Sequence, residues 1–344
     1  MITATTCIQK GHRVIRNLLA TFVFISLFPW GALHASAAPP HQQSASLVLD
    51  WTLNSDHGGI EAAIRRGFLR RRGIDLRAYT PSDTTTQIPL VAAGRADFGI
   101  SYEADLLAAR IRHIPVQSVM CIMQHPLNTV MTLRSSGITR PRRLQGRSVG
   151  IAGAPSDQPI VAAIVRHDGG DVSRVHFVNV GYSLLPALLA RKVDAVVGVY
   201  WTWEAIQARE KGYPVNVMRV ERWGVPNYCE LVLVASEGTI RSRPELVRST
   251  VQALQQGYAY AEKDPQAGWN ALAAADKTLA RQRGLVVGSL ALLRGAITDA
   301  PTIGNQNRPQ WVHYERWLAA NKLIQGLTNA GTAFTNQFLR PGIR

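Results

Sequence analysis

The chain has 344 residues, of which 46% are hydrophobic and 18% are charged. This composition excludes a disordered or collagen-like chain, and the length indicates about two domains. The formal charge is +15, but the basic residues are scattered in groups of one to three, as at residues 70–72. The excess therefore indicates a solvated basic surface, and no nucleic-acid partner is expected.

Residues 1–37 have the pattern of a cleaved secretory signal peptide. Three basic residues between Lys10 and Arg16 precede the mostly apolar run Leu18–Phe28, and Ala35–Ala37 supplies a small-x-small cleavage pattern. The apolar run is too short to span a bilayer comfortably, although an uncleaved anchor is the alternative. The sequence thus predicts export and cleavage near Ala37.

Two of the three cysteines, Cys121 and Cys229, lie beyond this segment. An oxidising compartment permits them to pair. Because Cys121 lies in an apolar, strand-like run, two buried free thiols are the expectation. Neither the cysteines nor the histidines show the spacing of a metal site, and no metal or cofactor is expected.

Short strands and helices alternate along the chain, which is typical of an α/β fold with a mostly parallel sheet. In the first part, strands are predicted at residues 47–51, 74–79, 98–100, 116–123 and 129–133, and helices at residues 58–68, 87–93 and 105–112. The pattern then restarts, with strands at residues 147–151, 176–180, 195–199 and 231–235, and helices from residue 158 and at residues 184–190. The remainder is mostly helical, at residues 244–263, 266–275 and 309–320.

The chain contains an internal similarity, because residues 90–102 resemble residues 188–200. Each segment contains a helix, a basic turn, an aspartate, an apolar strand, and then Tyr102 or Tyr200 at the carboxyl end of the strand. Ligands of open parallel sheets bind outside the carboxyl ends of the strands. Two such lobes place both tyrosines across one cleft, which suggests a hinged ligand trap.

Four motifs carry a resemblance to a known family. Residues 50–59, 94–102, 192–198 followed by Glu204, and 224–231 resemble the no-message-in-thiamine family of thiamine pyrimidine synthase-like proteins. The resemblance covers most of the chain from about Leu47 to Ala275. The subgroup it indicates comprises the bacterial pyrimidine-precursor binding proteins of thiamine salvage, which deliver formylaminopyrimidine or hydroxymethylpyrimidine to an ABC importer.

The resemblance implies an α/β, bilobal type II periplasmic-binding-protein fold, with two parallel-sheet lobes joined by a two-crossover hinge. The crossovers are expected near Gly137 and Val232, so that residues 45–137 and 233–344 form lobe 1 and residues 138–232 form lobe 2. A monomeric periplasmic protein without enzymatic activity is expected. Its implied partners are a small heterocyclic ligand and an ABC permease in the inner membrane.

The family also contains an enzyme branch, the yeast-type hydroxymethylpyrimidine phosphate synthase, which consumes its own pyridoxal phosphate and histidine. The position of its Schiff-base lysine is Ser101 here, and the position of its histidine is Asp105. Serine forms no Schiff base and aspartate offers no imidazole, so this enzyme is the less favoured interpretation. A binding protein for another heterocycle such as riboflavin, or for a small organic anion, is the first alternative.

Five candidate ligand-binding residues lie at the carboxyl ends of predicted strands or in the loops that follow. Trp51 can stack on a flat heteroaromatic ring, or it is a core residue. Asn54 and His57 can hydrogen-bond ring nitrogens and an amino group, although a capping role explains His57 equally well. Tyr102 and Tyr200 face the cleft in the two-lobe arrangement, with packing under the hinge as the alternative.

Three further candidates are Glu204, Tyr228 and Glu230. The Glu204 carboxylate can accept a hydrogen bond from a pyrimidine amino group, or it is a first-turn glutamate favoured by the helix dipole. Tyr228 belongs to the last family motif. Glu230 lies in an apolar strand, where a carboxylate needs a partner, so it is predicted in the site or the hinge. The loop 152–156 is a weak candidate anion cradle, and Asp157 beside it opposes a phosphate.

Overall fold

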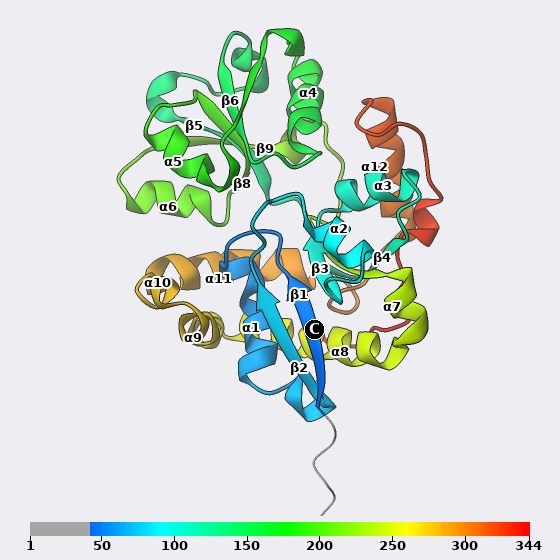
Figure 1. Cartoon of the computed structure of the whole chain (residues 1–344). Helices are drawn as coiled ribbons and strands as arrows, with labels where there is room; N and C mark the ends of the chain where they lie inside the picture. Colours follow the sequence, from blue (N-terminus) through cyan, green and yellow to red (C-terminus); the bar gives the residue numbers. More distant parts are fainter. Residues whose placement is uncertain (1–41) are drawn as a thin grey trace, which may run out of the picture. The chain divides into compact units, whose positions relative to one another are not determined.

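The computed structural model describes residues 42–344, all within one compact unit; the predicted signal peptide lies outside the described residues. Two five-stranded sheets organise this part of the chain (Figure 1). The first has the order β2-β1-β3-β10-β4 and the second the order β7-β6-β8-β5-β9. The strands are β1 Gln43–Val48, β2 Ile74–Tyr79, β3 Phe98–Ser101, β4 Val116–Met123, β5 Asn128–Leu133, β6 Ser148–Ile151, β7 His176–Asn179, β8 Ala195–Tyr200, β9 Val215–Arg219 and β10 Leu231–Ser236.

Each sheet is mixed, where parallel sheets were expected. One strand runs antiparallel to both of its neighbours, β10 in the first sheet and β5 in the second. These are the strands that the chain enters directly after crossing between the sheets. Both sheets therefore have the same topology, as the bilobal prediction requires.

The first crossover lies elsewhere than predicted. It occupies residues 124–127, because β5 pairs with β8 and β9 in the second sheet. The expectation of a crossover near Gly137 is wrong, since a wholly buried strand such as β5 has no exposed face that identifies its sheet. The second crossover occupies residues 220–230 and ends directly before β10, close to the predicted Val232.

The internal similarity corresponds to equivalent places in the two sheets. Asp97 Oδ2 accepts hydrogen bonds from the backbone N–H and the hydroxyl of Ser46, at 2.8 and 2.9 Å. Asp194 Oδ2 accepts the same pair from Ser148, both at 2.9 Å. Each aspartate thus ties the start of its strand, β3 or β8, to the neighbouring strand, β1 or β6.

Helices cover both faces of the first sheet (Figure 1). Apolar side chains alternate along its strands, so that Leu47 and Leu233 belong to one core cluster while Val48 and Val234 belong to another. The helices are α1 Gly58–Arg65, α2 Gln87–Ala92, α3 Glu103–Ile111, α4 Asp157–His167, α5 Leu184–Leu189, α6 Glu204–Glu210, α7 Glu237–Ser242, α8 Pro244–Lys263, α9 Pro265–Ala275, α10 Lys277–Ala280, α11 Arg283–Thr298 and α12 Arg308–Ala320. Within residues 42–344 no helix is long and apolar enough to cross a membrane.

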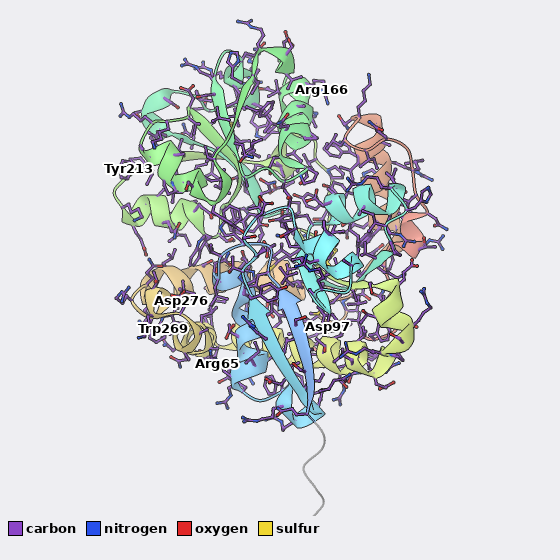
Figure 2. All side chains as sticks on the ribbon, viewed as in Figure 1. Arg65, Asp97, Arg166, Tyr213, Trp269 and Asp276 are labelled. Atoms are coloured by element: carbon purple, nitrogen blue, oxygen red, sulfur yellow. A yellow bond between two sulfur atoms is a disulfide. The ribbon has the colours of Figure 1, made fainter. Side chains whose placement is uncertain are left out.

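Helices α1 and α8 pack closely, and this contact positions the loop between β1 and α1. A Cβ atom on Gly257 would lie 2.0 Å from the carbonyl oxygen of Gly59, so α8 approaches the α1 backbone directly. The Tyr258 hydroxyl donates to the carbonyl oxygen of Asp56 at 3.0 Å. Charged side chains such as Arg65 lie on the outer side of these elements (Figure 2).

Cys121 and Cys229 form a disulfide, with Cα atoms 5.8 Å apart. The expectation of two free thiols is therefore wrong. The apolar surroundings of Cys121 indicate burial, but burial does not distinguish a thiol from a disulfide. The bond joins β4 to the end of the second crossover, because β10 lies beside β4 in the sheet.

Candidate functional site

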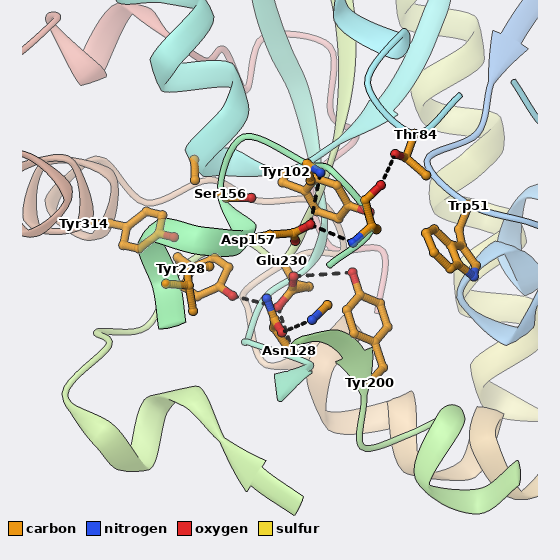
Figure 3. A pocket seen from close by; sticks show the side chains of 15 residues that line it. Trp51, Thr84, Tyr102, Asn128, Ser156, Asp157, Tyr200, Tyr228, Glu230 and Tyr314 are labelled. Atoms are coloured by element: carbon orange, nitrogen blue, oxygen red, sulfur yellow. Dashed lines mark hydrogen bonds between the residues drawn. The ribbon is translucent and has the colours of Figure 1, made fainter. Parts of the chain in front are cut away.

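A cleft lies where the two sheets meet, at the carboxyl ends of their parallel strands. Aromatic residues dominate its lining, namely Trp51, Tyr102, Tyr200, Tyr228 and Tyr314. In Figure 3, Trp51 and Tyr200 lie at one end of the cleft and Tyr228 and Tyr314 at the other. A smaller hollow shares Trp51, Tyr102 and Tyr200 with this cleft and adds Asp50, Asn54 and Glu204.

The loop after β1 supplies a buried carboxylate with two partners. Asp50 accepts hydrogen bonds from His57 Nε2 at 3.0 Å and from the Tyr102 hydroxyl at 3.2 Å. The backbone N–H of Asn54 donates to His57 Nδ1 at 3.2 Å, so Nε2 carries the proton in the neutral ring. His57 lines neither hollow. Its role here is to hold Asp50 and to complete the capping box of the turn at residues 55–57.

Glu230 connects both crossovers and also lines the cleft. Its Oε2 accepts hydrogen bonds from the backbone N–H groups of Leu127 and Asn128, at 2.8 and 3.0 Å, and from the Tyr228 hydroxyl at 2.9 Å. Its Oε1 accepts from the Tyr200 hydroxyl at 3.3 Å. Burial raises the pKa of Glu230 to about 7, against the effect of these donors. Glu230 was predicted to lie either in the site or in the hinge, and its position in the structure satisfies both descriptions.

Glu204 begins α6 and faces the smaller hollow. Its Oε2 accepts a hydrogen bond from the backbone N–H of Tyr200 at 2.7 Å, which satisfies one free donor before the helix. Burial raises the pKa of the Glu204 carboxyl to about 7. Glu204 therefore combines the helix-terminal role with a position on the cleft wall.

Contacts between the two sheet regions close the cleft on the Trp51 side. The Thr84 hydroxyl donates to the carbonyl oxygen of Ala152 at 2.9 Å, and the Tyr182 hydroxyl donates to that of Pro81 at 3.1 Å. Trp51 packs edge-on against Tyr182, with ring centroids 4.7 Å apart.

The lining is acidic as well as aromatic. Four carboxylates, Asp50, Asp157, Glu204 and Glu230, line the two hollows, and among the described residues no lysine, arginine or histidine does. Burial raises the pKa of Asp157 to about 6. Such a lining favours a neutral ring with amino donors, or a cation, over an anion.

Seven of the eight predicted site residues line the cleft or the smaller hollow, and His57 does not. The structure adds Thr84, Asn128, Asp157 and Tyr314 to the lining. Asn128 could have been predicted from the sequence, since it is a polar residue at the start of an apolar run. Thr84 and Tyr314 lie in segments whose sequence has no pattern of a binding site.

Comparison with solved structures identifies the fold. The fold matches that of the alkanesulfonate-binding protein SsuA from Xanthomonas axonopodis pv. citri bound to MOPS, with a TM-score of 0.67 and 14% identity over 87% of this chain and 99% of that chain. Two mixed sheets with two crossovers therefore form the bilobal, type II-like fold of periplasmic binding proteins.

The chain belongs to the NMT1/THI5 like family, whose model matches residues 54–268, and this confirms the predicted resemblance. It is 29% identical over 332 residues to the formylaminopyrimidine-binding protein of Halalkalibacterium halodurans, covering 95% of this chain and 99% of the relative. It is 24% identical over 235 residues to the 4-amino-5-hydroxymethyl-2-methylpyrimidine phosphate synthase THI5 of Saccharomyces cerevisiae, covering 65% and 68%.

Proposed function

We propose that the protein is the solute-binding component of an ABC importer and that it binds a thiamine pyrimidine precursor of the formylaminopyrimidine or hydroxymethylpyrimidine type. The observation that carries this proposal is the combination of five aromatic side chains with four carboxylates in the cleft and the smaller hollow that shares its lining. An aminopyrimidine is flat, and its amino group donates hydrogen bonds. The name of the full-length relative from H. halodurans supports the same ligand class.

The cleft assigns a role to each kind of side chain. Trp51 stacks on the ring, and the free carboxylate oxygen of Glu204 accepts from the amino group. Closure of the two lobes brings these groups onto one ligand, since Trp51 follows β1 of the first sheet and Glu204 follows β8 of the second. The closed form then docks on a permease in the inner membrane. This function places the protein in the periplasm as a monomer, after removal of residues 1–37.

A synthase of the yeast type is the less supported function. Ser101, at the position of the Schiff-base lysine, is buried in β3, and Asp105 lies in α3. Among the described residues no lysine lines the cleft. A binding role without catalysis therefore agrees better with the residues present. A small organic anion is disfavoured by the four carboxylates, while a larger heterocycle such as riboflavin remains a comparison for the experiment.

The test is a thermal-shift screen followed by calorimetric titration of the purified mature chain. Formylaminopyrimidine and hydroxymethylpyrimidine are compared with riboflavin, a dicarboxylic acid and pyridoxal phosphate. The proposal expects stabilisation by a pyrimidine alone, and no Schiff-base absorbance with pyridoxal phosphate. Stabilisation by riboflavin or by the dicarboxylic acid, without a response to either pyrimidine, would reject it.

A further inference from the structure

The loop after β6 directs three successive backbone N–H groups at one point. The N–H groups of Ala152, Gly153 and Ala154 each lie 3.0 Å from Asp157 Oδ2. Gly153 has a φ of +96°, a conformation that favours glycine and turns its N–H toward the same point. Successive N–H groups arranged in this way form a concave anion-binding nest. Here the anion in the nest is the side chain of the protein itself.

Asp157 is well suited to occupy this position. It is the first residue of α4, where the helix dipole favours a negative charge, and it is 4% exposed. Asp157 and two members of the loop, Ala152 and Ala154, line the cleft. A Cβ atom on Gly198, in β8 beside β6 of the same sheet, would lie 3.4 Å from Asp157 Oδ1, so this second oxygen faces the cleft lining. A ligand anion would have to displace a buried carboxylate that already satisfies three donors.

The rest of the cleft offers an anion no compensation. The other charged groups of the lining are Asp50, Glu204 and Glu230, and no basic side chain from the described residues lines either hollow. Asp105 on α3 adds a further carboxyl beside Asp157. A phosphate or sulfonate placed at the loop would therefore meet carboxylates and lose the N–H donors to Asp157.

We infer that Asp157 is a specificity-determining residue that fills the anion position of the cleft and restricts the ligand to unphosphorylated, neutral or cationic heterocycles. The names of two proteins compared above include an anionic group, a phosphate in the yeast synthase and an alkanesulfonate in the binding protein. The loop of this chain offers three N–H donors of the kind that bind such a group, but Asp157 already occupies them. The inference rests on the proposed function only for the identity of the ring.

The test compares wild type with Asp157→Ser, which frees the three N–H groups and removes the charge. The probes are hydroxymethylpyrimidine, its monophosphate, and inorganic phosphate or sulfate without any ring. Wild type is expected to bind the alcohol at least about 30-fold more tightly than the monophosphate, and Asp157→Ser to bind the monophosphate at least about tenfold more tightly than wild type does. Inorganic phosphate should raise the melting temperature of the variant and not that of wild type.

Asp171→Ser is the matched control. Like Asp157, Asp171 precedes or begins a helical segment and accepts a hydrogen bond from a backbone N–H group, that of Ser173. Unlike Asp157, it is exposed and does not line the cleft. It should bind every probe as wild type does. Where Asp157→Ser fails to fold by circular dichroism, Asp157→Asn keeps an acceptor for the loop, and the loss of charge alone should raise the affinity for the monophosphate at least about threefold.

The outcomes separate this inference from the proposed function. Equal wild-type affinity for the alcohol and its monophosphate, or no gain in anion binding by a folded variant, overturns the inference. Failure of wild type to bind any pyrimidine, with inorganic phosphate binding to Asp157→Ser alone, rejects the proposed function and supports the role of Asp157.

Discussion

Glu204 illustrates how one carboxylate serves the fold and the cleft at once. Its Oε2 accepts from the backbone of Tyr200, and a glutamine at this position retains an oxygen for that bond. The negative charge is the part that a ligand amino group or protonated ring would use. The isosteric variant therefore separates the two roles.

We predict that Glu204→Gln lowers the affinity for an aminopyrimidine at least about tenfold, equivalent to about 1.4 kcal/mol. The melting temperature without ligand should change little, because the helix-terminal bond survives. Calorimetric titration measures the affinity, and Glu210→Gln at the exposed end of the same helix is the control. Unchanged affinity would leave Glu204 as a helix-terminal residue only.

Trp51 gives a second prediction at this scale. It is partly exposed in the cleft and packs on Tyr182, so Trp51→Ala should weaken a stacked ligand by about 1–3 kcal/mol. Trp51→Phe keeps a flat ring and should restore most of the affinity. Fluorescence or calorimetric titration checks both variants. Loss of the folded state, with unchanged affinity in the folded fraction, would assign Trp51 to the core instead.

The positions of cleft residues could be predicted from the sequence where a local sequence pattern marks them. Tyr200 ends β8, Tyr102 directly follows β3, and Trp51 lies in the loop just after β1. Each of these positions is visible in the sequence as an apolar segment followed by an aromatic residue. Asp157 was recognised as unfavourable to phosphate, but its bonds to the loop follow from backbone geometry that a sequence does not specify. Tyr314 reaches the cleft from α12, through a contact with Tyr228 across more than eighty residues. No local pattern encodes such a contact.

At the scale of elements, the predicted strands and helices are largely present, and their failures have physical causes. The strand expected at residues 47–51 ends at Val48, because Asp50 turns away to meet His57. The long helix α11 was not predicted, since its glycines lower helix propensity. It forms because its apolar face packs into the core cluster that contains Leu47 of the first sheet, through residues such as Leu285 and Leu293.

The contact between α1 and α8 yields a prediction about stability. A methyl group on Gly257 would lie 2.0 Å from a backbone oxygen of α1, so Gly257→Ala should destabilise the protein by about 1–3 kcal/mol or more. Gly295→Ala is the control, because that position is helical, exposed and open within 4 Å, and should gain up to about 1 kcal/mol. Urea unfolding of both variants measures these changes in the free energy of unfolding. Equal effects would mean that α8 shifts freely on α1.

For the whole molecule, the buried carboxyls couple the cleft to stability. Glu230 ties residue 127 of the first crossover and residue 128 at the start of β5 to the end of the second crossover, where the disulfide at Cys229 also lies. Burial raises the pKa of Glu103 to about 8 and those of Glu204 and Glu230 to about 7. The groups that position the cleft are therefore groups that resist ionisation in the folded protein.

The sign of the resulting pH dependence follows from proton binding. Between the unfolded pKa values, about 4, and the folded values of about 7 to 8, the folded chain binds more protons than the unfolded chain. The free energy of unfolding therefore falls as pH rises through this window, by up to about 1.4 kcal/mol per pH unit for each such group. A rise in pH also lowers the large positive net charge of the protein, and the weaker repulsion raises the free energy of unfolding. At about 0.15 M salt this exposed charge is largely screened, so the effect is small.

We predict that the ligand-free protein melts at a higher temperature at pH 5.5 than at pH 8, at constant ionic strength. Calorimetric melting across this range is the measurement. Glu103→Gln should flatten the slope, because Glu103 accepts from the backbone of Cys229 but lines neither hollow, so its removal changes titration without changing the cleft. An aminopyrimidine should raise the melting temperature most near pH 8, where Glu204 is ionised and its free oxygen accepts most strongly from the amino group. A melting temperature that rises from pH 5.5 to pH 8 would show that these carboxyls ionise in the folded protein at little cost.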